Sequence, residues 1–320
     1  MSLRIIYMGT PDFAVAPLEA LLNAGCNVVG VITNPDKPAG RGQKIQESAV
    51  KKFAVEKGLY ILQPEKFRNE EFLNELRDLK ADLQVVVAFK MLPEMVWNMP
   101  KYGTLNLHAS LLPQYRGAAP INWAIINGDK ETGVSTFLLQ HEIDTGNILF
   151  QEKINIAEND NVEIIHDKLM NVGANLLVKT VKAIELGTYS QIPQKDFSSS
   201  HEPFKRAPKI FKEDCKIDWT KDLEDIHNLI RGLSPYPAAW TELLPNDEGK
   251  RVGLKIFTSK KEATIHSEID GTLITDGKSN LKVAVKGGFV HISMLQQAGK
   301  KRMKTEDFLR GFQQISNYHL

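Results

Sequence analysis

Hydrophobic runs alternate with amphipathic segments along the first half of the chain. Compact runs rich in Val, Ile and Leu occur at residues 3–8, 27–33, 82–89, 104–108 and 133–139. Segments with hydrophobic positions at helical spacing occur at residues 16–25, 47–58, 70–80, 120–128 and 161–187. Continuous apolar runs are typical of strands buried on both faces, and their alternation with helices favours a parallel sheet. The pattern therefore predicts an α/β domain with a doubly wound, mostly parallel sheet.

The pattern changes near residue 188. The following stretch, to about residue 209, carries Pro, Ser and charged residues without a period, as linkers do. Beyond it come one amphipathic segment at 223–233 and short β-like runs between 251 and 297. Short strands with Gly-containing turns predict a small β-barrel or β-sandwich. We expect a first domain at 1–188, a linker at 189–207 and a second domain at 208–320.

The composition is that of an ordinary globular protein, with 42% hydrophobic and 25% charged residues in a chain of 320, a length that suits two domains. No apolar run reaches the ~20 residues needed to span a bilayer, and the N-terminus lacks the shape of a signal peptide. Cys26 and Cys215 are the only cysteines, which excludes a disulfide framework and a Cys-based zinc cluster. We expect a cytoplasmic protein without a membrane partner.

Asn106 and His108 break the pattern of the run at 104–108, "TLNLH". Side chains two residues apart in a strand share a face, so Asn106 and His108 lie together, opposite Leu105 and Leu107. A strand end that emerges into solvent would explain such a pair. The alternative is an active site, because ligands of open α/β sheets bind beyond the carboxyl ends of the strands. Imidazole can exchange a proton near neutrality, and an amide can donate to a developing oxyanion.

Asp144 follows the next predicted strand, in the stretch "EIDTGN" at 142–147. Asp before Thr-Gly is often turn chemistry and no more. A carboxylate near an imidazole, however, favours the charged ring and fixes its tautomer. Together with a preceding strand that carries His108, Asp144 becomes a candidate for the same site.

Several common sites are not indicated. The first strand is followed by "GTPDF" at 9–13, which has no G-x-G-x-x-G spacing, and neither a P-loop nor H-E-x-x-H occurs in the chain. The sequence therefore disfavours a nicotinamide cofactor, ATP use and a zincin centre.

Basic residues gather in two places. A long segment at 34–52 lies between a predicted strand and helix, and a compact basic run occupies 297–304. The net charge is only +1, although basic residues slightly outnumber acidic ones after residue 200. The segment at 34–52 is either a flexible insertion or an arm that binds a phosphate backbone.

The residues now support a resemblance to a known family. The run "NLHASLLPQYRGAAPINWAI", with "DTG" beginning 36 residues after His108, resembles the formyltransferases that use 10-formyltetrahydrofolate. Four further stretches extend it over nearly the whole chain and resemble the branch that acts on methionyl initiator tRNA. They are "GTPDFAVAPLEAL", "NPDKPAGRGQK", "SPYPAAWT" at 234–241 and "LQQAGKKRM".

The resemblance implies an activity and a set of site residues. The activity is formyl transfer from 10-formyltetrahydrofolate to the free α-amino group of methionyl initiator tRNA, and the C-terminal part is implied to be an OB-like β-barrel. We expect a monomer, with no metal site and with no DNA partner. The implied catalytic residues are Asn106, His108 and Asp144. Folate contacts fall on Phe89, Ser110, Leu111, Leu112 and Pro113. tRNA contacts fall on Lys37, Arg41, Lys44, Lys300, Lys301 and Arg302, and Phe13 lies near the methionyl group. The family usually carries a glycine after the aromatic at 89, where this chain has Lys90.

Two alternatives stay open at this point. Relatives with the first motif act on glycinamide ribonucleotide or on amino-sugar nucleotides, but such small amines need neither the basic segment nor a second domain. A non-catalytic RNA-binding protein would not need Asn106, His108 and Asp144 together.

Overall fold

The computed structural model describes residues 2–39, 44–197 and 203–320. The chain divides into two compact units. Unit 1 comprises residues 1–117, 132–154 and 166–206, and unit 2 comprises residues 118–131, 155–165 and 207–320.

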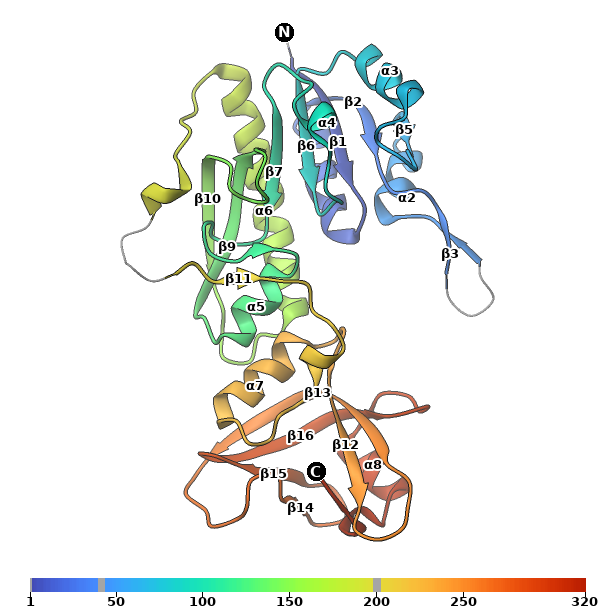
Figure 1. The fold of residues 1–320 in the computed structure, drawn as a ribbon, viewed down its shortest axis with the longest axis vertical. Helices are drawn as coiled ribbons and strands as arrows, with labels where there is room; N and C mark the ends of the chain where they lie inside the picture. Colours follow the sequence, from blue (N-terminus) through green and yellow to red (C-terminus); the bar gives the residue numbers. More distant parts are fainter. Residues whose placement is uncertain (1, 40–43, 198–202) are drawn as a thin grey trace. The chain divides into compact units, whose positions relative to one another are not determined.

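A twisted sheet forms the centre of unit 1 (Figure 1). Its strands, in spatial order, are β10 (Ile148–Asn155), β9 (Glu131–Leu138), β7 (Thr104–His108), β6 (Leu83–Val87), β1 (Arg4–Gly9), β2 (Asn27–Ile32) and β5 (Ile61–Leu62). The pairs from β7 to β5 are parallel, whereas β7 and β9 are antiparallel. The predicted doubly wound, mostly parallel sheet is confirmed.

Helices cover both faces of this sheet. They are η1 (Asp12–Ala14), α1 (Val15–Asn23), α2 (Ala49–Glu56), α3 (Glu70–Asp78), α4 (Glu94–Trp97) and most of α6 (Val162–Leu186). On one face, Ile6 and Val86 pack with Leu73 of α3 and Val96 of α4. On the other, Gly173 of α6 lies so close to Leu107 that an added Cβ would be 3.1 Å from it. Because helices cover both faces of the sheet, the side chains on both faces are apolar and the strands appear in the sequence as continuous apolar runs.

The basic segment at 34–52 contains a β-hairpin rather than an unstructured loop. β3 (Lys37–Ala39) and β4 (Lys44–Gln46) pair antiparallel, with Lys37 opposite Gln46. The hairpin was not predicted, because neither strand has a hydrophobic alternation long enough to signal one. Arg41 lies outside the described residues.

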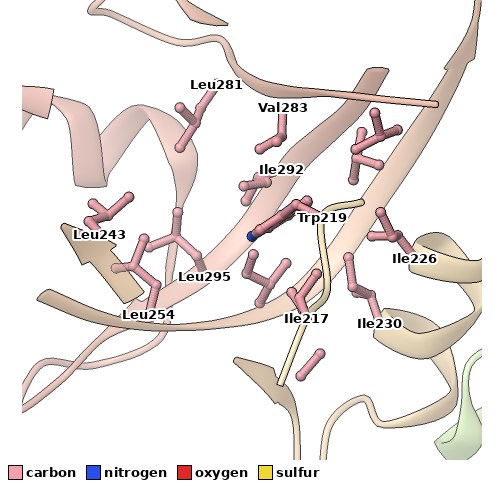
Figure 2. Close-up of a cluster of buried hydrophobic side chains, with 14 of the residues drawn as sticks. Ile217, Trp219, Ile226, Ile230, Leu243, Leu254, Leu281, Val283, Ile292 and Leu295 are labelled. Atoms are coloured by element: carbon pink, nitrogen blue, oxygen red, sulfur yellow. The ribbon is translucent and has the colours of Figure 1, made fainter. Parts of the chain in front are cut away.

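Unit 2 is a near-closed antiparallel barrel with helices (Figure 1). Its strands are β12 (Ala239–Pro245), β13 (Val252–Ala263), β14 (Leu273–Thr275), β15 (Leu281–Val285), β16 (Gly288–Gln297), β17 (Met303–Lys304) and β18 (Tyr318–His319). Its helices are α5 (Pro120–Ile126), η3 (Glu213–Cys215), α7 (Leu223–Gly232), α8 (Thr305–Gly311) and η4 (Ile315–Asn317). Figure 2 shows the barrel interior, where Trp219 is surrounded by aliphatic side chains such as Ile292 and Leu295. The predicted barrel is confirmed.

The compact units differ from the expected domain boundaries. We expected residues 1–188 to form one domain, but α5 packs in unit 2, where the Asn122 amide donates to the Gly232 carbonyl oxygen over 2.8 Å. Periodicity predicts that α5 is a helix, but it cannot say which core the helix joins.

The expected linker, 189–207, is structured where it is described. It contains η2 (Gln194–Phe197) and β11 (Arg206–Ala207), and β11 pairs with β8 (Arg116–Gly117). Within the described residues, no helix has both the length and the apolar character needed to cross a membrane.

Candidate active site

The carboxyl end of β7 brings Asn106 and His108 to one edge of the sheet. Asn106 pairs with Val86 of β6 and with Phe137 of β9, so its strand is flanked on both sides. His108 is only 8% exposed, whereas Asn106 is half-buried. Among the described residues, none forms a hydrogen bond with the Asn106 side chain. The amide is therefore available to a bound molecule.

The His108 ring is fixed by the loop that follows β7. Its Nε2 lies 3.0 Å from the backbone carbonyl oxygen of Tyr115. A carbonyl oxygen can only accept, so Nε2 carries a hydrogen and donates it. Tyr115 reaches this position with φ of 60°, an uncommon conformation for a residue with a side chain. The loop thus sets the tautomer, and Nδ1 is the ring nitrogen left for chemistry.

Asp144 faces that nitrogen. Its Oδ2 lies 3.9 Å from His108 Nδ1, and both side chains are about nine-tenths buried. The distance is too long for a hydrogen bond, but it allows an ion pair when the ring is protonated. Oδ2 also accepts from the backbone N–H of Gly117 over 2.9 Å. The predicted proximity of His108 and Asp144 is present in the structure.

A tight turn holds Asp144 in place. Asp144 has φ of 56°. At Gly146, an added Cβ would lie 1.7 Å from the backbone oxygen of Leu138, so only glycine fits there. The turn chemistry suspected from the sequence is therefore real, and it serves to aim the carboxylate.

Gln194 contacts the candidate site, and the sequence did not reveal it. Its side chain is 3% exposed, and its Nε2 donates to the carbonyl oxygens of Asp144 and Gly146 over 2.8 and 2.9 Å. Its Oε1 accepts from Nε and Nη2 of Arg116 over 2.9 and 2.6 Å. We assigned residue 194 to a linker because its neighbours have no period. The only signal in the sequence was a glutamine in a charged, Pro-containing stretch. Such glutamines are too common for this one to indicate a functional site.

Arg116 adds a positive charge near the carboxylate. Burial lowers the pKa of Arg116, while the negative charges of Asp144 and Glu142 act in the opposite direction. Its guanidinium carbon lies 5.7 Å from the centre of the Phe204 ring. Arg116 therefore lies between the Asp144 turn and the segment that contains Phe204.

Two family models match this chain. The model described as formyl transferase covers residues 3–181, and the model of the C-terminal domain of formyl transferases covers residues 209–313. A methionyl-tRNA formyltransferase from Bacteroides fragilis is 60% identical over 310 residues, which make up 97% of this chain and 95% of that protein. The chain belongs to the methionyl-tRNA formyltransferase family. A member from Flavobacterium johnsoniae is 51% identical over 97% of this chain and 96% of its own. The resemblance read from the motifs is confirmed.

Solved structures of more distant proteins share the fold. The N-formyltransferase from Helicobacter canadensis, in complex with folinic acid and dTDP-3-aminofucose, has a TM-score of 0.66 at 22% identity and covers 94% of this chain and 100% of its own. HypX from Aquifex aeolicus, in complex with tetrahydrofolic acid, has a TM-score of 0.62 at 17% identity. The match covers 98% of this chain and 48% of HypX, so this chain spans about half the length of that protein.

The segment assigned to folate in this family is largely a scaffold here. Ser110 and Leu112 are fully or almost fully buried, and Ser110 Oγ donates to the Gln114 carbonyl oxygen over 2.6 Å. Leu112 packs with Phe137 and Ile148. Pro113 is buried as well, so among residues 110–113 only the Leu111 side chain is partly exposed. A ligand at this segment would meet mainly backbone groups.

Two aromatic positions complete the predicted pocket residues. Phe89 is half-buried, and its ring centre lies 6.0 Å from that of Phe67. The Lys90 ammonium lies 4.5 Å from the Phe67 ring centre, and burial lowers the pKa of Lys90. Phe13 is 7% exposed and meets the edge of the His166 ring at 5.2 Å.

The predicted tRNA contacts lie in both units. Lys37 is exposed on β3, and Lys44 lies in β4. Lys300, Lys301 and Arg302 are exposed in the turn that follows β16. Among the described residues, no group of three or more His, Cys, Asp or Glu side chains is placed to hold a metal ion.

Proposed function

We propose that this chain transfers the formyl group of 10-formyltetrahydrofolate to the free α-amino group of methionyl initiator tRNA. Membership of the methionyl-tRNA formyltransferase family supports the reaction. The observation that carries the mechanism is the placement of His108 Nδ1 opposite Asp144, beside the available amide of Asn106, at the carboxyl end of β7.

Asn106 stabilises the negative charge that develops on oxygen. An α-amino group titrates near ~8, so a useful fraction is neutral at pH 7 and can attack the formyl carbon. The attack pushes charge onto the formyl oxygen, and the Asn106 amide donates to it. Loss of one such donor costs about 3 kcal/mol of transition-state stabilisation.

His108 handles the proton that the amine must lose. Its Nε2–H is engaged by Tyr115, so Nδ1 accepts the proton. Asp144 then stabilises the resulting imidazolium across the 3.9 Å that separate the two groups. When the intermediate collapses, the bond between the formyl carbon and the folate nitrogen N10 breaks. The proton on Nδ1 passes to N10, and tetrahydrofolate leaves. The hydrogen bond of His108 to Tyr115 favours proton transfer through Nδ1 and leaves the oxyanion to Asn106.

Substrate contacts follow the positions that the family resemblance assigns. We propose that folate lies along the backbone of 110–113 and near Phe89, and that the methionyl side chain lies near Phe13. Lys37, Arg41, Lys44, Lys300, Lys301 and Arg302 contact the phosphate backbone of the tRNA, where each cation neutralises local negative charge. Because the family acts in bacterial translation, we place the protein in the cytoplasm. We also propose that it is a monomer.

The decisive experiment measures tetrahydrofolate release from 10-formyltetrahydrofolate. Purified protein is incubated with methionyl initiator tRNA, with uncharged tRNA and with an amino-sugar nucleotide. We expect turnover with the charged tRNA alone. Turnover with the amino-sugar nucleotide instead would assign the protein to the small-amine branch, and RNA binding without any turnover would support a non-catalytic role.

A further inference from the structure

Unit 2 carries an open pocket of about 610 Å³ outside the barrel core. Its lining includes Phe211, Tyr236, Trp240, Lys212, Lys255 and Gly299. Tyr236 and Trp240 come from the "SPYPAAWT" stretch at 234–241. Ala239 of this stretch belongs to the barrel core and Trp240 packs against that core, but neither the core nor the proposed catalytic site explains the exposed Tyr236 ring.

The aromatic rings of this pocket are exposed. Tyr236 is 81% exposed and Phe211 is 58% exposed, so neither ring contributes much to a core. Trp240 is half-buried, and its Nε1 donates to the Lys212 carbonyl oxygen over 2.8 Å, which fixes the plane of the indole. Trp219 offers a contrast, since it is 7% exposed and lies inside the barrel (Figure 2).

Lysines surround these rings. The ammonium groups of Lys212 and Lys216 lie 5.4 and 5.7 Å from the Trp240 ring centre, and that of Lys209 lies 5.5 Å from the Phe211 ring centre. Lys255 pairs across the strands with Trp240 and donates to the Pro237 carbonyl oxygen over 3.1 Å. The lysines are therefore held at the aromatic surface.

Three carboxylates lie near this pocket, against the four lysines named above. Asp214 accepts from the Phe211 N–H over 2.8 Å, and Glu242 lies 3.8 Å from Arg251. Glu213 is exposed and lies on η3. The opposite rim, at Gly299, continues directly into the basic turn of Lys300, Lys301 and Arg302.

We propose that this pocket binds an unstacked base of the RNA substrate, stacked on the aromatic rings, while the flanking lysines contact the adjacent phosphates. Aromatic faces bordered by cations are what single-stranded nucleic acid requires, because every base has a π-face and every linkage a negative charge. An uncharged apolar ligand would not need the lysines. The proposal rests on the proposed function, which supplies the RNA.

The test compares formylation kinetics of three variants with methionyl initiator tRNA as the varied substrate. Tyr236→Ala should raise KM about five- to hundredfold, the range for loss of one stacked base, with kcat unchanged. Tyr236→Phe keeps the ring and should behave like the wild type. Ile269→Ala, at a position that is 81% exposed in the same unit, is the matched control and should have no effect.

Salt dependence separates stacking from charge. Lys212→Ala should reduce the slope of log affinity against log salt by about one, whereas Tyr236→Ala should lower affinity without changing that slope. A KM of Tyr236→Ala within twofold of the wild type would overturn the proposal, as would an equal loss in Ile269→Ala. If the wild type itself fails to formylate methionyl-tRNA, the proposed function fails first. Binding of uncharged tRNA to the same variants, measured by filter retention, then decides the pocket's role separately.

Discussion

At the scale of single residues, the proposed chemistry depends on which ring nitrogen of His108 is free. Nε2 donates a hydrogen bond to the Tyr115 carbonyl oxygen, and Asp144 faces Nδ1 without a direct hydrogen bond. An isosteric amide at 144 would keep the shape of the turn but remove the charge that stabilises the imidazolium.

Asp144→Asn should lower kcat by about a hundredfold or more, within the range typical of lost acid–base assistance. The KM for methionyl-tRNA should stay close to that of the wild type, since Asp144 is not among the proposed tRNA contacts. Steady-state kinetics with both substrates varied will check this. Turnover near that of the wild type would exclude the proposed role of the carboxylate.

At the scale of elements, the segment after α6 contacts the candidate site. Gln194 ties the Asp144 turn to Arg116 through hydrogen bonds from both ends of one amide. Removing the amide leaves two carbonyl oxygens and a guanidinium without these partners.

Gln194→Ala should lower kcat at least tenfold and destabilise unit 1 by about 4 kcal/mol, because it removes four hydrogen bonds of about 1 kcal/mol each. Gln194→Glu keeps an acceptor for Arg116 but has no N–H for the Asp144 and Gly146 carbonyl oxygens. It should therefore be as impaired in kcat as the alanine variant. Full activity in Gln194→Glu would show that only the contact with Arg116 matters.

The β3–β4 hairpin is the second element with a testable role. Lys37→Ala should raise the KM for methionyl-tRNA and reduce the salt slope by about one, because one phosphate contact is lost. Folate affinity should not change. Lys57→Ala, which removes an exposed lysine at the end of α2, is the matched control. A change in folate affinity in Lys37→Ala would mean that the hairpin borders the folate site instead.

At the scale of the whole molecule, each unit has its own core, and unit 2 contains a pH-sensitive contact. His227 is 3% exposed on α7, and its Nδ1 lies 2.9 Å from Ser259 Oγ on β13. Burial lowers the pKa of His227, and the positive charges of Lys261 and Arg231 lower it further. In the unfolded chain His227 is protonated below about pH 6.5, whereas in the folded unit it stays neutral to a lower pH. The free energy of unfolding therefore falls as the pH drops below about 6.5.

The apparent Tm of unit 2 should therefore decrease between pH 7.5 and pH 5.5. His227→Asn should reduce this decrease, because it removes the titrating group while keeping a polar side chain at the position. His319→Asn, at an exposed histidine, should leave the pH profile unchanged. Thermal melts across this range, followed by circular dichroism, provide the measurement. An identical pH profile in His227→Asn would exclude the mechanism.

Local pattern alone determined much of this protein. The apolar runs predicted the buried strands, and the helical spacing predicted α2, α3 and α6. The polar pair Asn106 and His108 marked the edge of the sheet at which we place the proposed site. These features can be predicted from the sequence because each depends on neighbouring residues within one strand or one helix. The shared motifs added the family.

Only the tertiary structure showed which residues far apart in the sequence form hydrogen bonds with one another. The Gly117–Asp144 hydrogen bond spans 27 residues, the Gln194–Asp144 bond spans 50 and the Arg116–Gln194 bonds span 78. The tautomer of His108 depends on a carbonyl oxygen that only the folded loop presents. Whether α5 belongs to the first or the second core likewise depends on packing. A hydrogen bond or a packing partner has no period in the sequence, so these features are settled only when the chain folds.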